Sequence, residues 1–157
     1  MGLGNYQPLE EIYPLAIGAY GDSLINITNV YSAINNDGYL LSPSIIESIE
    51  FNNGELIWDH KLNSQKIIDS NIVIAINQML EQTVSEGSGI AASIIGEKIY
   101  GKTGTSDNNR DLWFIGSIKN LTTGIWLGHD NNDSSIFSSG DAAYLWKTFI
   151  NKIKDNL

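Results

Sequence analysis

The sequence predicts an α+β fold in which an antiparallel sheet packs against amphipathic helices. Apolar residues recur every three to four positions in three segments, which is typical of helices with one buried face. From Lys98 onward the apolar period changes to two over three successive segments, as expected for strands. A last helical segment follows these strands and offers an apolar face to cover them.

Two helices are predicted in the first half of the chain. The first spans about Leu24 to Asn35, and Asp37-Gly38 ends it because glycine accepts the left-handed conformation there. The second spans about Ser70 to Ser85 and ends at Gly87-Ser88-Gly89.

The remaining elements are a hairpin, three strands and a final helix. Residues 39–58 predict the hairpin, with its turn at Asn52-Asn53-Gly54. The strands are expected at about 99–105, 112–118 and 123–128, and the helix at 141–154. The four tryptophans are expected to pack in the core: Trp58, Trp113, Trp126 and Trp146.

Length and composition narrow the function classes. At 157 residues a single domain is expected. A net charge of −9 with nine basic residues argues against nucleic acid and against an anionic membrane surface as partners. No stretch approaches the roughly 20 apolar residues of a membrane span. The N-terminus lacks the basic and apolar regions of a secretory signal, so the chain alone is expected to stay in the cytoplasm.

The string Gly101-Lys102-Thr103-Gly104-Thr105 is the strongest candidate for a binding strand. Gly104 has no side chain, so a ligand can approach the backbone closely. We expect Lys102 and Thr105 to lie on the same side of the strand and to offer an ammonium, a hydroxyl and a backbone N–H. An anionic group such as a peptide carboxylate fits these donors.

The wider sequence resembles the C-terminal part of the transpeptidase domain of class A (bifunctional) penicillin-binding proteins. The motifs that carry the resemblance are Leu15–Gly18, Val30–Tyr39, Met79–Gly89, Gly101–Ser106, Arg110–Gly116, Gly124–Asp130 and Gly140–Phe149. They follow the family's order and spacing. The resemblance implies a penicillin-binding-protein/serine β-lactamase-like transpeptidase fold, with three antiparallel strands of its central sheet plus flanking helices.

The resemblance also implies roles for individual residues. Lys102 would be catalytic and substrate-binding, acting on the field around the nucleophile. Thr103 and Thr105 would face the substrate, Gly104 would let it approach, and the N–H of Thr105 would form half of an oxyanion hole. Neither a metal nor an organic cofactor is expected, and Arg110, Asp111 and Trp113 resemble supports of the strand pair.

The family's nucleophile motif Ser-x-x-Lys does not occur in these 157 residues. Ser106-Asp107-Asn108 spells the family's Ser-x-Asn motif but overlaps the binding strand, so we interpret it as a coincidence. Residues 1–157 are therefore expected to be a partial transpeptidase domain that is inactive alone. The implied partners are peptidoglycan stem peptides, β-lactams and a separately encoded upstream half, and the implied location is the periplasmic face of the inner membrane.

Two other functions remain open at this point. Gly96-Glu97-Lys98-Ile99-Tyr100-Gly101-Lys102-Thr103 fits the P-loop pattern of nucleotide-binding proteins, although a strand and not a helix is expected next. A non-catalytic module that captures stem peptides through Lys102 and Thr105 would keep the fold without the enzyme. The sequence does not choose between a remnant, a split-gene half and a functional module.

Overall fold

The computed structural model describes Gly18 and residues 21–157. The described helices are α1 (Leu24–Asn35), α2 (Ser70–Ser85) and α3 (Ser139–Ile153). The described strands are β1 (Tyr39–Leu41), β2 (Ser48–Glu50), β3 (Leu56–Asp59), β4 (Ser64–Lys66), β5 (Ile99–Thr105), β6 (Asp111–Ile118) and β7 (Leu121–Gly128). The α+β class is confirmed.

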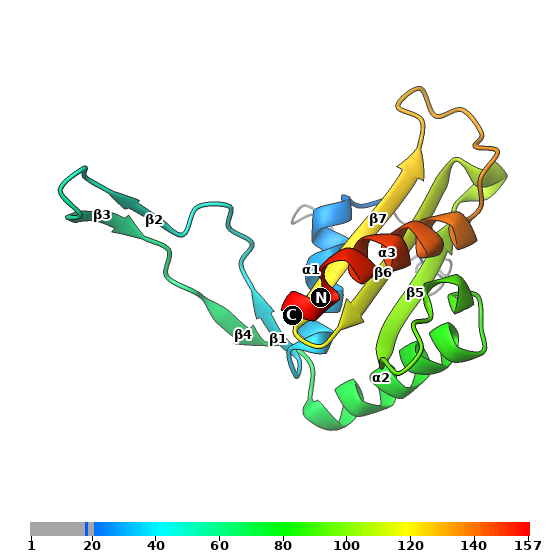
Figure 1. Ribbon diagram of the computed structural model, residues 1–157, viewed down its shortest axis with the longest axis horizontal. Helices are drawn as coiled ribbons and strands as arrows, with labels where there is room; N and C mark the ends of the chain where they lie inside the picture. The colour runs from blue at the N-terminus through cyan, green and yellow to red at the C-terminus, as the bar shows by residue number, and fades with distance from the viewer. Residues whose placement is uncertain (1–17, 19–20) are drawn as a thin grey trace.

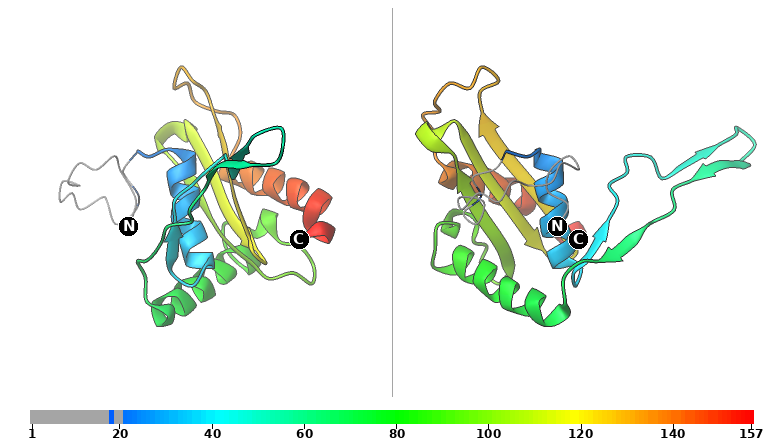
Figure 2. Two further views of the ribbon diagram at one scale, coloured as in Figure 1. Left: turned by 90° about the vertical axis from the view of Figure 1, so that its left-hand side faces the viewer. Right: turned by 180° about the vertical axis from the view of Figure 1, so that it is seen from behind.

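A three-stranded antiparallel sheet in the order β5-β6-β7 forms the centre of the body (Figure 1). Helix α3 covers one face of this sheet and α1 the other, while α2 runs beside β5 (Figure 2). Two glycines show how closely the helices pack. A Cβ on Gly116 would lie 2.7 Å from the ring of Trp146 in α3, and one on Gly124 would lie 2.3 Å from Thr28 Oγ1 in α1.

The main hydrophobic core lies between α3 and the sheet. Its buried members are Val84, Ala92, Ile94, Ile99, Phe114, Ile118, Ala142, Ala143, Trp146 and Ile150. Phe114 and Trp146 meet edge to face, with ring centroids 5.4 Å apart, an arrangement that aromatic pairs favour. A smaller cluster of Ile34, Val73 and Leu80 joins α1 to α2.

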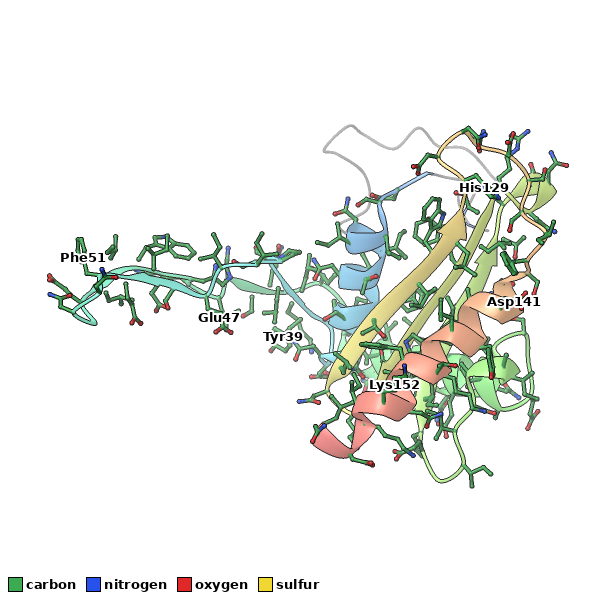
Figure 3. All side chains as sticks on the ribbon, turned by 45° about the horizontal axis from the view of Figure 1, so that its top comes forward. Tyr39, Glu47, Phe51, His129, Asp141 and Lys152 are labelled. Atoms are coloured by element: carbon green, nitrogen blue, oxygen red, sulfur yellow. The ribbon has the colours of Figure 1, made fainter. Side chains whose placement is uncertain are left out.

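A two-stranded arm, residues 39–66, extends away from the body (Figure 1, Figure 3). At its base β1 pairs with β4, and further out β2 pairs with β3. The predicted turn is confirmed at Gly54, whose φ is 84°. The predicted end of the hairpin at Trp58 is wrong, because the antiparallel pairing continues to Lys66. Trp58 is 43% exposed, so the expectation that it packs in the core is also wrong.

The boundaries of the body elements follow local backbone chemistry. Helix α1 ends as predicted, since Asp37 and Gly38 have positive φ and the Gly38 N–H donates to the Ala33 carbonyl at 2.8 Å. Helix α3 begins two residues earlier than predicted, because the Asp141 carboxylate accepts hydrogen bonds from the N–H and hydroxyl of Ser138. These bonds satisfy groups at the start of the helix.

Candidate functional site

Strand β5 carries all four residues predicted to bind substrate, and it lies at one edge of the sheet. Its paired edge contacts β6 from Ile99 to Thr105. Its other edge has no strand partner among the residues that the structure describes. The side chains of Lys102 and Thr105 are exposed. An edge strand with exposed donors can pair with an extended ligand.

The direction of the backbone N–H groups on β5 follows from one hydrogen bond. Ser106, directly after the strand, donates its N–H to the carbonyl of Asp111 at 3.0 Å, and therefore towards β6. Successive N–H groups of an antiparallel strand point to opposite edges. The N–H of Thr105 therefore points to the open edge, where a ligand oxygen can accept it.

The side chains of β5 alternate between the two faces of the sheet. Thr103 and Thr105 lie opposite Phe114 and Leu112 of β6, whereas Lys102 lies opposite Ile115. The expectation that Lys102 and Thr105 share a side is wrong, because they are three positions apart and the strand period is two. The Lys102 ammonium donates to the carbonyl of Thr103 at 2.9 Å.

Thr103 is buried, with 8% of its surface exposed. Its hydroxyl lies 2.7 Å from the hydroxyl of Ser88, in the turn that follows α2. That turn is closed by the N–H groups of Gly87 and Gly89, which donate to the carbonyl of Thr83 at 3.1 and 3.0 Å. In the structure the Thr103 hydroxyl is therefore engaged by Ser88, whereas Thr105 is exposed. Our sequence interpretation treated Ser88 only as part of a helix end.

Gly104 has no side chain, so the backbone of β5 is uncovered beside Trp113. A Cβ at Gly104 would stand 3.2 Å from the Cβ of Trp113, tighter than ordinary van der Waals contact. The half-buried Trp113 and the exposed Lys102 flank this glycine on the same face. A ligand backbone can therefore approach β5 most closely at Gly104.

The structure also bears on the other sequence motifs. Gly101-Lys102-Thr103 lies inside β5, and no helix begins there, so this segment lacks the strand-to-helix geometry that cradles phosphate. Ser106-Asp107-Asn108 continues directly from β5 into the short turn η3 (Asp107–Asn109). Within the described residues, none of the helices has the length and apolar character needed to cross a membrane.

Comparison with known proteins shows which family the chain, including strand β5, belongs to. Residues 5–142 match the family described as the penicillin binding protein transpeptidase domain. This chain belongs to that family. The match includes β5 and every residue of the predicted binding strand. The part of the resemblance carried by Leu15–Ile17 lies outside the described residues.

Curated relatives of the transpeptidase family are similar over most of this chain. Penicillin-binding protein 1A of Rickettsia typhi is 31% identical over 149 residues, covering 80% of this chain and 19% of the relative. Penicillin-binding protein 1B of Haemophilus influenzae is 26% identical over 156 residues, covering 97% of this chain and 20% of the relative. The chain thus spans about a fifth of the length of these relatives.

Solved structures of family members share the fold. Penicillin-binding protein 1A from H. influenzae aligns with a TM-score of 0.79 at 19% identity, over 92% of this chain and 28% of that one. PonA1 from Mycobacterium tuberculosis, solved in complex with penicillin V, aligns with a TM-score of 0.77 at 21% identity, over 90% of this chain and 41% of that one. The expected penicillin-binding-protein transpeptidase fold is therefore confirmed.

Proposed function

We propose that residues 1–157 form part of a D,D-transpeptidase domain that cross-links peptidoglycan stem peptides in the cell envelope. In this proposal β5 binds the carboxylate end of a D-alanyl-D-alanine stem, or the carboxylate of a β-lactam. Membership of the transpeptidase family supports the reaction class. The penicillin V complex of PonA1 supports β-lactams as ligands.

The open edge of β5 is the observation that carries the proposal. The exposed Thr105 offers its hydroxyl to a carboxylate and its N–H, which points away from β6, to a ligand carbonyl oxygen, and Gly104 leaves room for a ligand backbone. The exposed Lys102 adds an ammonium that can turn from the Thr103 carbonyl to an anion. Charge-assisted hydrogen bonds to a carboxylate are about twice as strong as neutral ones.

The reaction we assign to the complete site is acyl transfer through a serine. The serine oxygen attacks the carbonyl carbon between the two D-alanines, the terminal D-alanine leaves with the proton, and an amine of a second stem displaces the serine. The carbonyl oxygen gains negative charge during attack and is stabilised by the N–H groups of Thr105 and of the serine itself. Such donors lower the barrier by about 3–4 kcal/mol each. No metal or organic cofactor takes part.

The attacking serine is the component that these 157 residues do not supply in the Ser-x-x-Lys context. Acyl transfer without an activated nucleophile does not proceed. We therefore propose that the 157-residue chain binds ligand but does not become acylated. Intact mass after incubation with excess benzylpenicillin tests this point: an unchanged mass in a folded sample agrees with it, and a one-penicilloyl adduct contradicts it.

Binding is tested with two ligands that differ only in their terminal group, a carboxylate in one and a neutral amide in the other. A D-alanyl-D-alanine peptide with a free carboxylate should shift the amide signals of Gly104 and Thr105 in a saturable NMR titration, whereas its C-terminal amide should not. Lys102→Ala should weaken carboxylate binding by about 3–10-fold. Equal shifts with both ligands, or none, would contradict carboxylate recognition on β5. Saturable binding without acylation is also what a non-catalytic stem-binding module requires.

A further inference from the structure

The carboxylate of Asp111 joins all three strands of the sheet at the end where Thr105 lies. One oxygen, Oδ2, accepts the hydroxyl of Ser106 at 2.9 Å, directly after β5. The other oxygen, Oδ1, accepts the indole N–H of Trp126 in β7 at 3.0 Å. Asp111 itself is the first residue of β6. A single side chain therefore bridges β5, β6 and β7.

The backbone of Asp111 closes the connection between β5 and β6 as well. Its N–H donates to the Ser106 hydroxyl at 2.8 Å, and its carbonyl accepts the Ser106 N–H at 3.0 Å. Between these two residues, Asn108 and Asn109 both have positive φ, 59° and 53°. Asparagine adopts this conformation more readily than other non-glycine residues, and the bonds between Ser106 and Asp111 close the turn that it forms.

Trp126, which binds the other oxygen of Asp111, has little free space around its ring. A Cβ on Gly128 would lie 2.4 Å from the Trp126 ring and 2.9 Å from the carbonyl oxygen of Arg110. Gly128 therefore lies between the indole and the Arg110 carbonyl, and the indole N–H binds Asp111. Because the ring is confined, the position of the Asp111 carboxylate is fixed from two directions.

We propose that Asp111 is a positioning residue that holds the Thr105 N–H at the angle needed to donate a hydrogen bond to a ligand oxygen. Thr105 is one residue from Ser106, whose hydroxyl and N–H both bind Asp111. The Ser106 N–H belongs to the Thr105–Ser106 peptide unit, so a change in the Ser106 geometry shifts Thr105 and, with it, the direction of the Thr105 N–H. This inference rests on the proposed function of β5, and Asp111 acts on the ligand only through Ser106 and Thr105.

The experiment compares Asp111→Ala with Asp141→Ala in the full 157-residue chain. Asp141 is a matched control, since its carboxylate also accepts two hydrogen bonds, both from Ser138, but lies at the start of α3. Each variant loses a carboxylate and is expected to lose some stability. Only Asp111→Ala should lower the ¹⁵N order parameter of the Thr105 amide and weaken binding of the D-alanyl-D-alanine peptide, by about 3–10-fold.

Variants that remove one bond each keep the test informative if Asp111→Ala does not fold. Ser106→Ala deletes the β5 contact and Trp126→Phe deletes the β7 contact, so each should give part of the effect. Asp111→Asn keeps an oxygen acceptor and a donor to the Ser106 hydroxyl, so it should restore most of the binding. A simple structural role would lower the melting temperature of all these variants without moving the Thr105 amide.

The outcomes separate this inference from the proposed function. An unchanged Thr105 amide in Asp111→Ala and Ser106→Ala overturns the positioning role, even if the peptide binds. A changed Thr105 amide in a chain that never binds the peptide supports the positioning role and contradicts carboxylate recognition. Equal loss of binding in Asp111→Ala and Asp141→Ala would also overturn the inference, because a general loss of stability would explain both.

Discussion

The body and the arm use similar apolar residues in different ways. In the body, Phe114 and Ile118 of β6 are fully buried beneath α3. In the arm, Ile49, Phe51 and Trp58 belong to or border strands of similar composition, yet 43–56% of their surface is exposed. A strand signal in the sequence reports local backbone preference, and burial depends on what the fold places over the strand.

Replacing one tryptophan in each region should give the largest contrast. Trp146→Ala removes a fully buried ring from the main core and should cost about 3–5 kcal/mol of unfolding free energy. Trp58→Ala in the arm should cost less than about 1 kcal/mol, since its ring is already partly in water. Urea denaturation followed by far-UV circular dichroism measures both. Similar losses would show that the arm is part of the cooperative core.

A substitution at Gly38, where the arm joins the body, should have the next largest effect on the free energy of unfolding. Gly38 has a φ of 83°, and a Cβ there would lie 2.0 Å from the carbonyl oxygen of Ile68. Gly38→Ala should therefore cost about 2–3 kcal/mol. Gly54→Ala is the matched control, because Gly54 has a φ of 84° but nothing within 4 Å, and it should cost about 1 kcal/mol from backbone strain alone. If Gly38→Ala and Gly54→Ala had equal melting temperatures, the close approach of Gly38 to Ile68 would not contribute to stability.

The smallest expected effect is a pH dependence at the base of the arm. Hydrogen bonds from Lys66 and Ser70 lower the pKa of Asp37. A group whose folded pKa is lowered stabilises the fold above its unfolded pKa, and that contribution disappears as pH falls through the folded pKa. The β1–β4 pairs should therefore loosen in acid, on the low side of the ordinary aspartate pKa of about 4. Amide exchange at Leu40 and Gln65 measures this loosening.

Asp37→Asn is the control for this pH effect. Its side chain does not ionise, so exchange at the arm base should become less dependent on pH. Asp141 also has a lowered pKa, because of its bonds to Ser138, and acid will weaken the body independently of Asp37. The comparison between wild type and Asp37→Asn removes this shared contribution. An unaltered pH profile in Asp37→Asn would contradict the role given to the Lys66–Asp37 contact.

The sequence predicted those elements whose signal lies within their own residues. The bounds of α1, α2 and β5 agree with the prediction, because periodicity and glycine turns mark them directly. The β1–β4 pairing escaped prediction because Ser64-Gln65-Lys66 has no apolar alternation. Its position depends on the N–H groups of Ile67 and Ile68, which both donate to the Gly38 carbonyl. Such contacts join distant parts of the sequence and leave no local pattern.

In the candidate site, too, the features with a local sequence signal could be predicted and those that depend on distant contacts could not. Lys102 to Thr105 could be located from their motif, and the residue types indicated an anionic ligand. The burial of Thr103 could not be predicted, because it depends on Ser88, fifteen positions away, reaching β5 from the end of α2. The link from Asp111 to Trp126 likewise depends on the pairing of β6 with β7. Three-dimensional packing, and not the motif, decides which donor faces outward.

The arm also determines where the polypeptide can be divided. Neither hydrophobic cluster contains a residue between Leu41 and Lys66, so a cut at Asn53-Gly54 would sever no core contact. The first piece would contribute α1 and the second would contribute α2, α3 and the sheet. Two separately produced pieces of this chain should therefore recombine without a covalent link, and the tip near Phe51 (Figure 3) is the natural position for an inserted tag or protease site.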